Sequence, residues 1–415
     1  MGHRQPAGAG GRGEPVTDHF AADVILRDIV VYAELGDHRT GWPADNAVSD
    51  WLVHELSAAG LAAELASFSF PLIQPEPSWI EAGGERVTGA PLYDGGVTGS
   101  DGVTGRLTDD PAQADGAILL LRGAPVAAHG KAAPWGDARP AGAILVTGDP
   151  EGAVFHRNAE RIDAPLEVPV LQVARSDAGP LEAALAAGAP AHLVVQARRE
   201  TGTATNVVAT LPATSPNPAA ALVVMTPKSG WGPCAAERGG GIVIELALAR
   251  LLATLPDRRR EVRFLFTGGH ELAHYGLCAL LDDRPELAED VELWVHLGAS
   301  IGSRLPLVSN VLASDEAARA DLLAAFEAEE AGPVESRAPG TVPGGEAREV
   351  TDRRYVSQAG SHAYFHSEND TVEKAVDAER VARFGRAFRR LVEPLVISTS
   401  STINTGDSAD APTSA

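Results

Sequence analysis

Two stretches of the sequence concentrate the residue types that do chemistry in proteins. The first, residues 270–274, reads His-Glu-Leu-Ala-His and matches the H-E-x-x-H pattern, in which two histidines on one helix face bind zinc. Gly268-Gly269 come directly before it, so we expect His270 at the N-terminus of a helix over 270–281. The helix dipole there favours a neutral imidazole, which can accept a proton or bind a metal. The pattern thus predicts a functional role for His270, while for His274 it leaves open packing or capping within the core.

The second stretch, residues 226–238, follows a predicted strand and is also dense in reactive types. Lys228 and Arg238 can bind a carboxylate or stabilise an oxyanion. Ser229 or Cys234 could act as a nucleophile if His270 reaches it, but for Cys234 we favour a loop with no covalent role. The two cations, with a helix start after Gly239-Gly240-Gly241, predict a substrate or leaving group that bears a carboxylate. The predicted substrate-binding residues are Thr226, Ser229, Trp231 and Arg238.

The elements that position these residues alternate between strands and helices beyond Thr203. Apolar runs predict strands over 206–211, 221–225, 262–266 and 291–297, and amphipathic patterns predict helices over 242–255, 270–281, 315–330 and 377–395. This alternation is typical of an α/β fold with a mostly parallel sheet covered on both faces. In such sheets the chemistry lies at the carboxyl ends of the strands, where both reactive stretches fall.

The first half of the chain does not show this alternation of strands and helices. Thr17 can cap a first helix, a second begins near Asp45, and a strand follows over 61–70. Between the two helices lies a polar turn, residues 38–43, with one histidine. From Glu85 to Arg199, short apolar runs alternate with Gly- and Pro-rich turns, which indicates a small β-rich module with one helix near 179–187. The predicted organisation is a disordered start (1–16), an α/β domain in two pieces (17–84 and 200–398), an inserted module (85–199) and a disordered tail (399–415).

Composition excludes several classes of partner. The 415 residues carry a formal net charge of -22, which disfavours nucleic acid and anionic membranes. No stretch approaches the roughly 18 apolar residues of a membrane span. Cys234 and Cys278 are too few for a disulfide framework, and residues 1–14 lack the apolar core of a signal peptide. We therefore expect a cytoplasmic protein that acts on a small molecule or short peptide; its oligomeric state leaves no mark in the sequence.

The order of the elements resembles the zinc aminopeptidase family that includes bacterial leucyl aminopeptidases, glutaminyl cyclases and the transferrin-receptor ectodomain. Four stretches carry the resemblance: His38 to Leu56 with its opening helices, Asn206-Val207-Val208-Ala209, Gly239 to Arg250, and Val262 to Gly276. The module over 85–199 resembles the protease-associated domain that is often inserted in this family. The resemblance covers nearly the whole chain and implies a two-zinc peptidase fold.

The resemblance also implies where metal ligands would fall, and most positions have changed. The family's His-x-Asp reads Thr226-Pro227-Lys228, its bridging Asp falls on Ala235, and its next Asp falls on Gly298. The Glu-Glu pair reads His270-Glu271, and the late histidine is kept as His366, followed by Asp370-Thr371. A two-zinc site is therefore not expected. Glu271 and His366, with His270 or His274, could instead hold a single zinc ion, with His362 and His296 as spare candidates; the alternative is an empty polar pair.

Three functions remain open. The first is an enzyme that hydrolyses an amide or peptide bond in a small, acidic substrate, with His270 as base. Glu271 and His366 would hold one metal or orient water, and Lys228 and Arg238 would bind the anion. The second is metal-free acyl transfer or a lyase step in the same pocket. The third is an inactive binding protein, as in the transferrin-receptor branch. The replaced positions have gained cations and histidines, which favours a rebuilt active site of a peptidase- or amidohydrolase-like hydrolase over a dead one.

Overall fold

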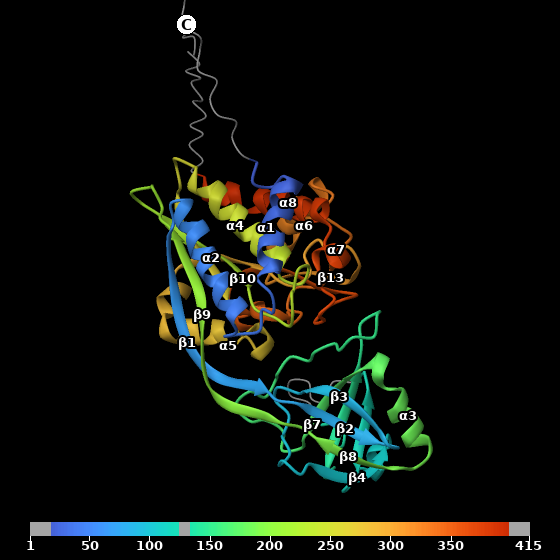
Figure 1. The fold of residues 1–415 in the computed structure, drawn as a ribbon. Coiled ribbons are helices and arrows are strands. Elements are labelled where there is room, and N and C mark those ends of the chain that lie inside the picture. The colour runs from blue at the N-terminus through green and yellow to red at the C-terminus, as the bar shows by residue number, and fades with distance from the viewer. Residues whose placement is uncertain (1–17, 124–132, 398–415) are drawn as a thin grey trace, which may run out of the picture.

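A computed structural model describes residues 18–123 and 133–397 of the chain. Thr17, the predicted cap of the first helix, lies outside these ranges. The described residues form a helix-covered sheet and a smaller barrel, and two long strands run from one to the other (Figure 1).

The large sheet has eight strands and is parallel at its centre. Its order is β1 (Ala62–Pro75), β9 (Ala197–Leu211), β11 (Arg260–Thr267), β10 (Ala219–Pro227), β12 (Val291–Leu297), β15 (Tyr355–His362), β13 (Pro306–Ala313) and β14 (Glu335–Ser336). The strands β11, β10, β12 and β15 are parallel neighbours, whereas β1, β9 and β13 pair antiparallel. This mixed α/β sheet confirms the predicted fold class.

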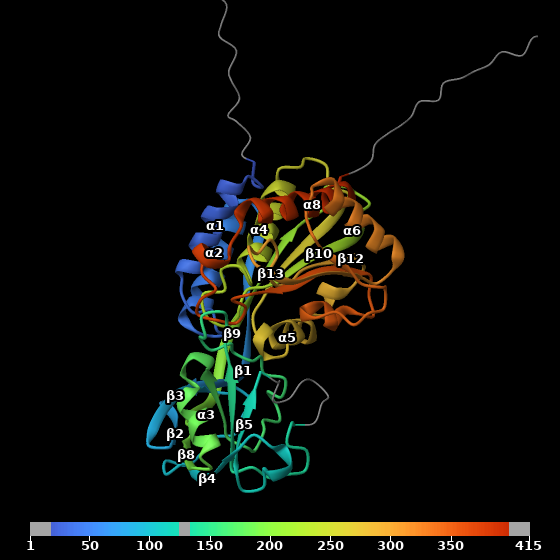
Figure 2. The same ribbon diagram turned by 90° about the vertical axis from the view of Figure 1, so that its right-hand side faces the viewer.

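Helices cover both faces of the sheet (Figure 2). One face packs against α1 (Ala22–Glu34), α2 (Pro43–Ala58), α4 (Gly239–Ala253), α6 (Glu316–Ala328) and α8 (Ala378–Val396), which enclose the largest apolar core, and the short α7 (Val372–Ala375) precedes α8. The other face packs against α5 (Tyr275–Asp283) and a 3₁₀ turn over Gly345–Val350. The inward-facing positions predicted for the last helix are buried: Val381, Phe384, Phe388 and Leu391. None of the helices in the described ranges is long and apolar enough to cross a membrane.

The inserted module is a closed seven-stranded barrel. Its order is β2 (Ser78–Ala82), β3 (Glu85–Pro91), β7 (Val170–Ala174), β6 (Gly142–Thr147), β5 (Ile118–Arg122), β4 (Val103–Thr108) and β8 (Pro190–Val194). The helix α3 (Gly179–Ala186) contributes Leu181 and Ala184 to the barrel core. The strand β2 lies ahead of Glu85, where the sequence predicted the module to begin, and β9 starts at Ala197.

One predicted element is wrong in a way that matters for the site. Residues 270–281 are not a single helix: a 3₁₀ turn covers His270–Leu272, Ala273 and His274 have positive φ angles of 55° and 58°, and α5 starts at Tyr275. Gly269 O accepts hydrogen bonds from the backbone N–H groups of Leu272 (3.1 Å) and Tyr275 (3.0 Å), which closes a tight loop. Tertiary closure of this loop therefore overrides the helical pattern, and the H-E-x-x-H histidines do not share a helix face.

Candidate functional site

The candidate site lies at the edge of the sheet where its central parallel strands end. Because β10, β11, β12 and β15 run in the same direction, the loops that follow them meet at this edge. The loop after β10 carries Lys228, Ser229, Glu237 and Arg238. The loop after β11 carries His270 and Glu271, and His366 follows β15.

A buried ion pair lies in the middle of this edge. The guanidinium of Arg238 places Nη2 2.6 Å from Oε1 of Glu237, and the same oxygen lies 3.3 Å from Nε2 of His366. Arg238 Nε also donates to the backbone oxygen of Ser229 (2.8 Å). Burial alone would raise the pKa of Glu237, but Arg238 and His366 hold that pKa far below its usual range, so the carboxylate stays ionised.

The polar atoms of this cluster are satisfied mainly by one another. Glu237 Oε1, Arg238 Nη2 and His366 Nε2 meet as ion pairs whose angles are poor for hydrogen bonds, and Arg238 Nη1 makes no hydrogen bond among the described residues. Buried polar atoms are nearly always hydrogen-bonded in folded proteins. Arg238 Nη1 is therefore the donor of this cluster that remains available for a further polar partner.

A second cluster joins two histidines through one carboxylate. The ring of His270 places Nδ1 3.0 Å from Glu346 Oε1, and His296 places Nε2 3.3 Å from Glu346 Oε2. His296 Nδ1 also bonds the hydroxyl of Ser357 (2.8 Å). Gly345 has a φ of +65°, and a Cβ there would lie 3.0 Å from the ring of His296, so a glycine is required to bring Glu346 this close.

His270 is neutral at physiological pH. Burial, with the charge of Arg238 as the next cause, lowers the pKa of His270 to about 4. Its Nδ1 bonds Glu346, and no hydrogen bond to Nε2 is present within the described residues. The side chain is 10% exposed, so Nε2 is the ring nitrogen that remains able to accept a proton.

The second histidine of the H-E-x-x-H pattern has a partner of its own. His274 Nδ1 lies 3.0 Å from Glu349 Oε1, and the rings of His270 and His274 are 5.3 Å apart. Each histidine is thus held by a different carboxylate of the same 3₁₀ turn. The two rings are neighbours without pointing at a shared ligand position.

Glu271 faces a hydroxyl pair. One of its oxygens accepts hydrogen bonds from the backbone N–H and the hydroxyl of Thr40 (both 2.7 Å), and the other accepts from Ser229 Oγ (2.8 Å). Burial raises the pKa of Glu271. The Ser229 hydroxyl donates to this carboxylate and makes no hydrogen bond to the ring of His270, so the arrangement considered for a serine nucleophile, with His270 as its base, is not present. Cys234 is fully buried, and burial raises the pKa of its thiol well above the usual value, which fits the non-covalent role we favoured.

Lys228 and Thr226 are tied into the interior. The ammonium of Lys228 pairs with the carboxylate of Asp45 near the start of α2, and both side chains are completely buried. The hydroxyl of Thr226 donates to Leu297 O (2.6 Å). These contacts brace the strand ends that carry the site.

A pocket opens beside Glu271. It is lined by Arg39, Trp42, Tyr93, His156 and Trp231 among others. The guanidinium of Arg39 lies over the rings of Trp42 (4.6 Å) and Trp231 (5.4 Å), and the ring of His156 stacks on Trp231 at 5.3 Å. His156 comes from the barrel, so the barrel forms one wall of this pocket, which we call the entrance pocket.

The sequence reasoning missed four of these residues. The resemblance placed the family's bridging aspartate at Ala235, which lies in the apolar core. The carboxylate found at this edge of the sheet is Glu237, two positions further along the chain. Arg39 and Thr40 belong to the polar turn over 38–43. Its polar composition between two helices could have marked it as part of a site, but no function was assigned to it. Glu346 lies in a segment without periodicity, and only the neighbouring Gly344-Gly345 pair marks it.

The side chains as they stand do not form a zinc site. In the part of the chain that the structure describes, no group of three or more His, Cys, Asp or Glu side chains could hold a metal ion. Of the four predicted ligands, Glu271 bonds Thr40 and Ser229, His270 and His274 bond separate carboxylates, and His366 approaches Glu237. Zinc would have to displace each of these side chains from its present partner, so the donor set as it stands does not fit the ion.

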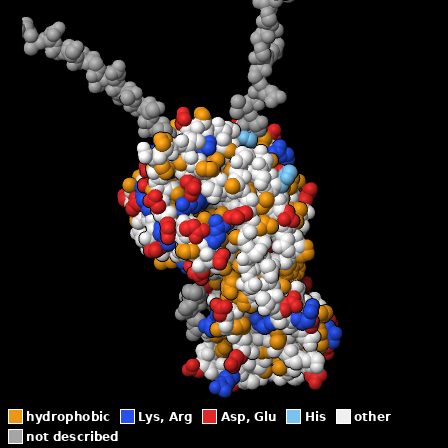
Figure 3. All heavy atoms as spheres, turned by 90° about the vertical axis from the view of Figure 1, so that its left-hand side faces the viewer, with side chains coloured by type: hydrophobic (Ala, Val, Ile, Leu, Met, Phe, Trp, Pro, Cys, Tyr) orange, Lys and Arg blue, Asp and Glu red, His pale blue; other side chains and the backbone are white. Residues whose placement is uncertain are grey.

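The surface away from the site mixes both signs of charge. On the face drawn in Figure 3, acidic and basic side chains are interspersed over the described residues.

Comparisons with known proteins agree with this fold. No protein-family model matches the chain. In sequence it is 25% identical over 375 residues to the probable lipoprotein aminopeptidase LpqL of Mycobacterium tuberculosis, covering 84% of this chain and 68% of that protein.

Solved structures of aminopeptidases superpose on nearly the whole chain. A zinc aminopeptidase from Bacillus subtilis has a TM-score of 0.73 at 17% identity and covers 94% of this chain and 98% of its own. The aminopeptidase of Aneurinibacillus sp. strain AM-1 has a TM-score of 0.66 at 17% identity, covering 92% and 96%. A peptidase M28 precursor from Shewanella amazonensis has a TM-score of 0.71 at 15% identity, covering 91% and 98%. The chain therefore has the fold of the zinc aminopeptidases.

Proposed function

We propose that this protein is a peptidase-like hydrolase that cleaves an amide or peptide bond in a small substrate bearing a carboxylate. The fold shared with aminopeptidases supports the class of reaction. The observation that carries the proposal is the neutral, carboxylate-held His270 beside the buried cation Arg238, at the carboxyl edge of the sheet.

In the proposed amide hydrolysis, His270 transfers the proton and Arg238 stabilises the negative charge. His270 Nε2 takes a proton from water, and the hydroxide attacks the amide carbon. Negative charge then develops on the carbonyl oxygen. Stabilising it through Arg238 requires the bound substrate to reach this wholly buried guanidinium and to share it with Glu237, its present partner. The proton passes from His270 to the leaving nitrogen as the C–N bond breaks, which returns the imidazole to its neutral form.

The supporting residues act by position. Glu346 accepts from Nδ1 of His270 and so fixes the tautomer that leaves Nε2 unprotonated. Lys228, suggested by the sequence for the oxyanion, acts indirectly here because its ammonium holds Asp45. Ser229 and Glu271 form a polar floor between the cluster and the entrance pocket.

The entrance pocket supplies the specificity. Arg39 and Trp231 lie on its wall, and the guanidinium of Arg39 stands between two indole rings. A guanidinium held in this way suits a planar carboxylate, and the rings suit a flat or apolar portion of the same substrate. Arg39 now pairs with Asp37 (3.2 Å) and the cavity encloses about 30 Å³, so the substrate carboxylate would replace Asp37 and the pocket would widen on binding. This pocket, and not the buried Arg238, is where we place the carboxylate of the substrate.

In the proposed reaction no step passes through a metal. In place of the zinc of the related fold, the cation at this point is Arg238, which would have to share its charge between Glu237 and the developing oxyanion. A site with one zinc at most, on Glu271 and His366, would require Glu271 to leave Thr40 and Ser229 and His366 to leave Glu237.

Hydrolysis of glutamate and leucine p-nitroanilides by the untagged, full-length protein tests the proposal. We expect turnover of the glutamate compound above that of the leucine compound. The variant His270→Asn should lower kcat by about 10²–10⁴-fold, the usual contribution of a general base, and Glu346→Gln should lower it less. His54→Asn, an exposed histidine on α2, serves as the control and should match wild type.

Two results would contradict this proposal. One is turnover that His270→Asn leaves intact. The other is no turnover of either compound above the His270→Asn background while both still bind, which would favour the binding role. Release of a cyclised or transferred acyl product in place of free acid would point to the acyl-transfer alternative.

A further inference from the structure

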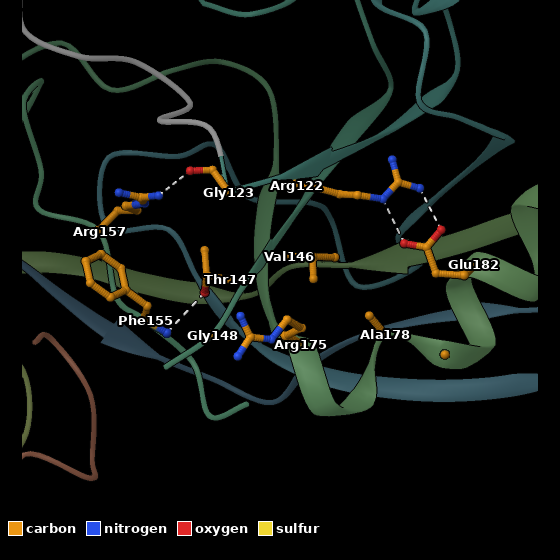
Figure 4. Close-up of a pocket in the computed structure, with 11 residues that line it drawn as sticks. Arg122, Gly123, Val146, Thr147, Gly148, Phe155, Arg157, Arg175, Ala178 and Glu182 are labelled. Carbon is orange, nitrogen blue, oxygen red and sulfur yellow. Dashed lines mark hydrogen bonds and ion pairs between the residues drawn. The ribbon is translucent and has the colours of Figure 1, made fainter. Parts of the chain in front are cut away.

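A second and larger pocket lies in the barrel, outside the site described above. It encloses about 720 Å³ at the carboxyl ends of the parallel strands β5, β6 and β7 and beside the start of α3 (Figure 4). Three arginines line it, Arg122, Arg157 and Arg175, together with apolar surface from Phe155 and Val146. Cationic side chains gathered in one cavity need explaining in a chain whose formal net charge is -22.

One of the three arginines is fully neutralised. Arg122 pairs with Glu182 through two hydrogen bonds (2.6 and 2.8 Å) and with Asp109 (3.0 Å). In Figure 4 the Arg122–Glu182 pair occupies one side of the pocket, away from the other two arginines. Its positive charge is therefore neutralised by acidic side chains of the barrel itself.

The other two arginines have no acidic partner among the described residues. Arg157 donates from Nη2 to the backbone oxygen of Gly123 (2.6 Å) and lies over the ring of Phe155 at 4.9 Å. Its buried Nε makes no hydrogen bond there, and burial lowers the pKa of its guanidinium. Arg175 donates from Nη2 to the backbone oxygen of Asp149. Both contacts satisfy a donor without neutralising the charge.

This arrangement favours an anion. Arg157 is partly removed from water and lacks a counter-charge, and an anion would relieve this desolvation cost, while the exposed Arg175 adds a second positive charge to the pocket lining. The start of α3 lies at the other end of the pocket, beside Glu182, whose carboxylate in the first turn offsets the partial positive charge of the helix. Guanidinium forks also match the planar geometry of carboxylate and phosphate oxygens.

We propose that the barrel pocket binds a small organic anion, whose carboxylate or phosphate head pairs with Arg157 and Arg175 while its carbon skeleton packs on Phe155 and Val146. The Arg122–Glu182 pair closes the far side and limits the head to one end of the cavity. This binding site is separate from the entrance pocket, and its existence does not depend on whether the chain is a hydrolase.

Isothermal titration calorimetry of the full-length protein in low-salt, phosphate-free buffer tests the site, with citrate as the carboxylate probe and inorganic phosphate as the phosphate probe. We expect one saturable site per chain for at least one probe. In the double variant Arg157→Gln/Arg175→Gln the affinity should fall at least about tenfold, equivalent to about 1.4 kcal/mol. Arg106→Gln is the matched control, because Arg106 is an exposed barrel arginine that also donates to a backbone oxygen.

The two probes separate the sources of the anion. Saturation by citrate alone assigns a carboxylate head, saturation by phosphate alone assigns a phosphate head, and competition between them assigns a common oxoanion site. If the melting temperature of the double variant without anion is below that of wild type, the two single variants are measured in its place. Arg157→Lys should keep part of the affinity because it retains the charge. The proposal is overturned if neither probe saturates, or if the arginine variants bind as tightly as wild type.

Discussion

Fully buried charges are the most informative residues of this protein. Arg238 with Glu237 and Lys228 with Asp45 have no exposed side-chain surface, and each pair carries a large desolvation cost. Such pairs rarely add stability over apolar residues of the same size, and strongly perturbed ionisable groups cluster at functional sites. The candidate site holds both pairs at one sheet edge, which is why we assign the chemistry there.

A buried carboxyl group away from the site gives a test of the same electrostatics. Glu245 is completely buried in α4, and burial raises its pKa well above the usual value. The folded state thus holds its proton more tightly than the unfolded state, so stability is lost as pH rises from the unfolded pKa through the folded pKa. Glu245→Gln, which cannot ionise, should be more stable than wild type at pH 7, by about 1.4 kcal/mol per pH unit in that window.

Urea unfolding of wild type and Glu245→Gln between pH 4 and 8 measures this difference. The two proteins should converge below about pH 4.5, where the unfolded carboxyl is also protonated. Glu85→Gln, at an exposed position of β3, is the control and should show no such divergence. Equal stability of wild type and Glu245→Gln across the whole range would contradict the assignment.

At the scale of elements, the tight loop after β11 decides how the site is built. Ala273 and His274 adopt left-handed backbone conformations in succession, which costs about 1–2 kcal/mol for each non-glycine residue. Gly276 allows the loop to close, since a Cβ there would lie 2.1 Å from the backbone oxygen of Gly268. The loop turns His270 toward Glu346 and Glu271 toward Thr40, so the strain is held at the site.

Glycine at one of these positions should relieve the strain. Ala273→Gly is expected to stabilise the protein by about 0.5–1 kcal/mol, because the cost of the left-handed backbone exceeds the extra entropy of the unfolded glycine. The same change at Ala279, inside α5, should destabilise by about 1 kcal/mol. Chemical unfolding measures both, and a loss of stability in Ala273→Gly would show that the left-handed conformation at Ala273 is wrong.

The sequence predicted regular elements better than it predicted the site. The sequence located the strands β10, β11 and β12 because they are largely apolar runs buried on both faces of the sheet. It located α4 as a long apolar segment and α6 and α8 by the helical spacing of their buried residues. Residues 306–313 and 355–362 form strands that were not predicted, and β15 completes the parallel centre. The loop over 268–276 depends on closure by distant contacts, which no local pattern encodes. Glu346 reaches His270 for the same reason, across 76 positions of sequence.

At the scale of the molecule, the barrel belongs to the candidate site as well as to its own pocket. The strands β1 and β9 pair along their full length and carry the barrel away from the sheet (Figure 1). Residues 155–159 return to the site: the backbone N–H of Ala159 donates to Glu271 O (2.8 Å), and that of His156 donates to His366 O (2.9 Å). The ring of Phe155 lines the barrel pocket and also lies 5.3 Å from the ring of His366. A module without a cluster of catalytic residue types thus forms a wall of the site.

The zinc content of the protein tests the central claim most directly, namely that the guanidinium of Arg238 supplies the positive charge at this sheet edge. The untagged, full-length protein would be incubated with excess zinc, desalted and measured by elemental analysis beside Glu271→Ala and His366→Ala. We predict far less than one zinc per chain in wild type, and no difference between wild type and the two variants. One or more zinc ions per chain in wild type, lost in both variants, would contradict the account.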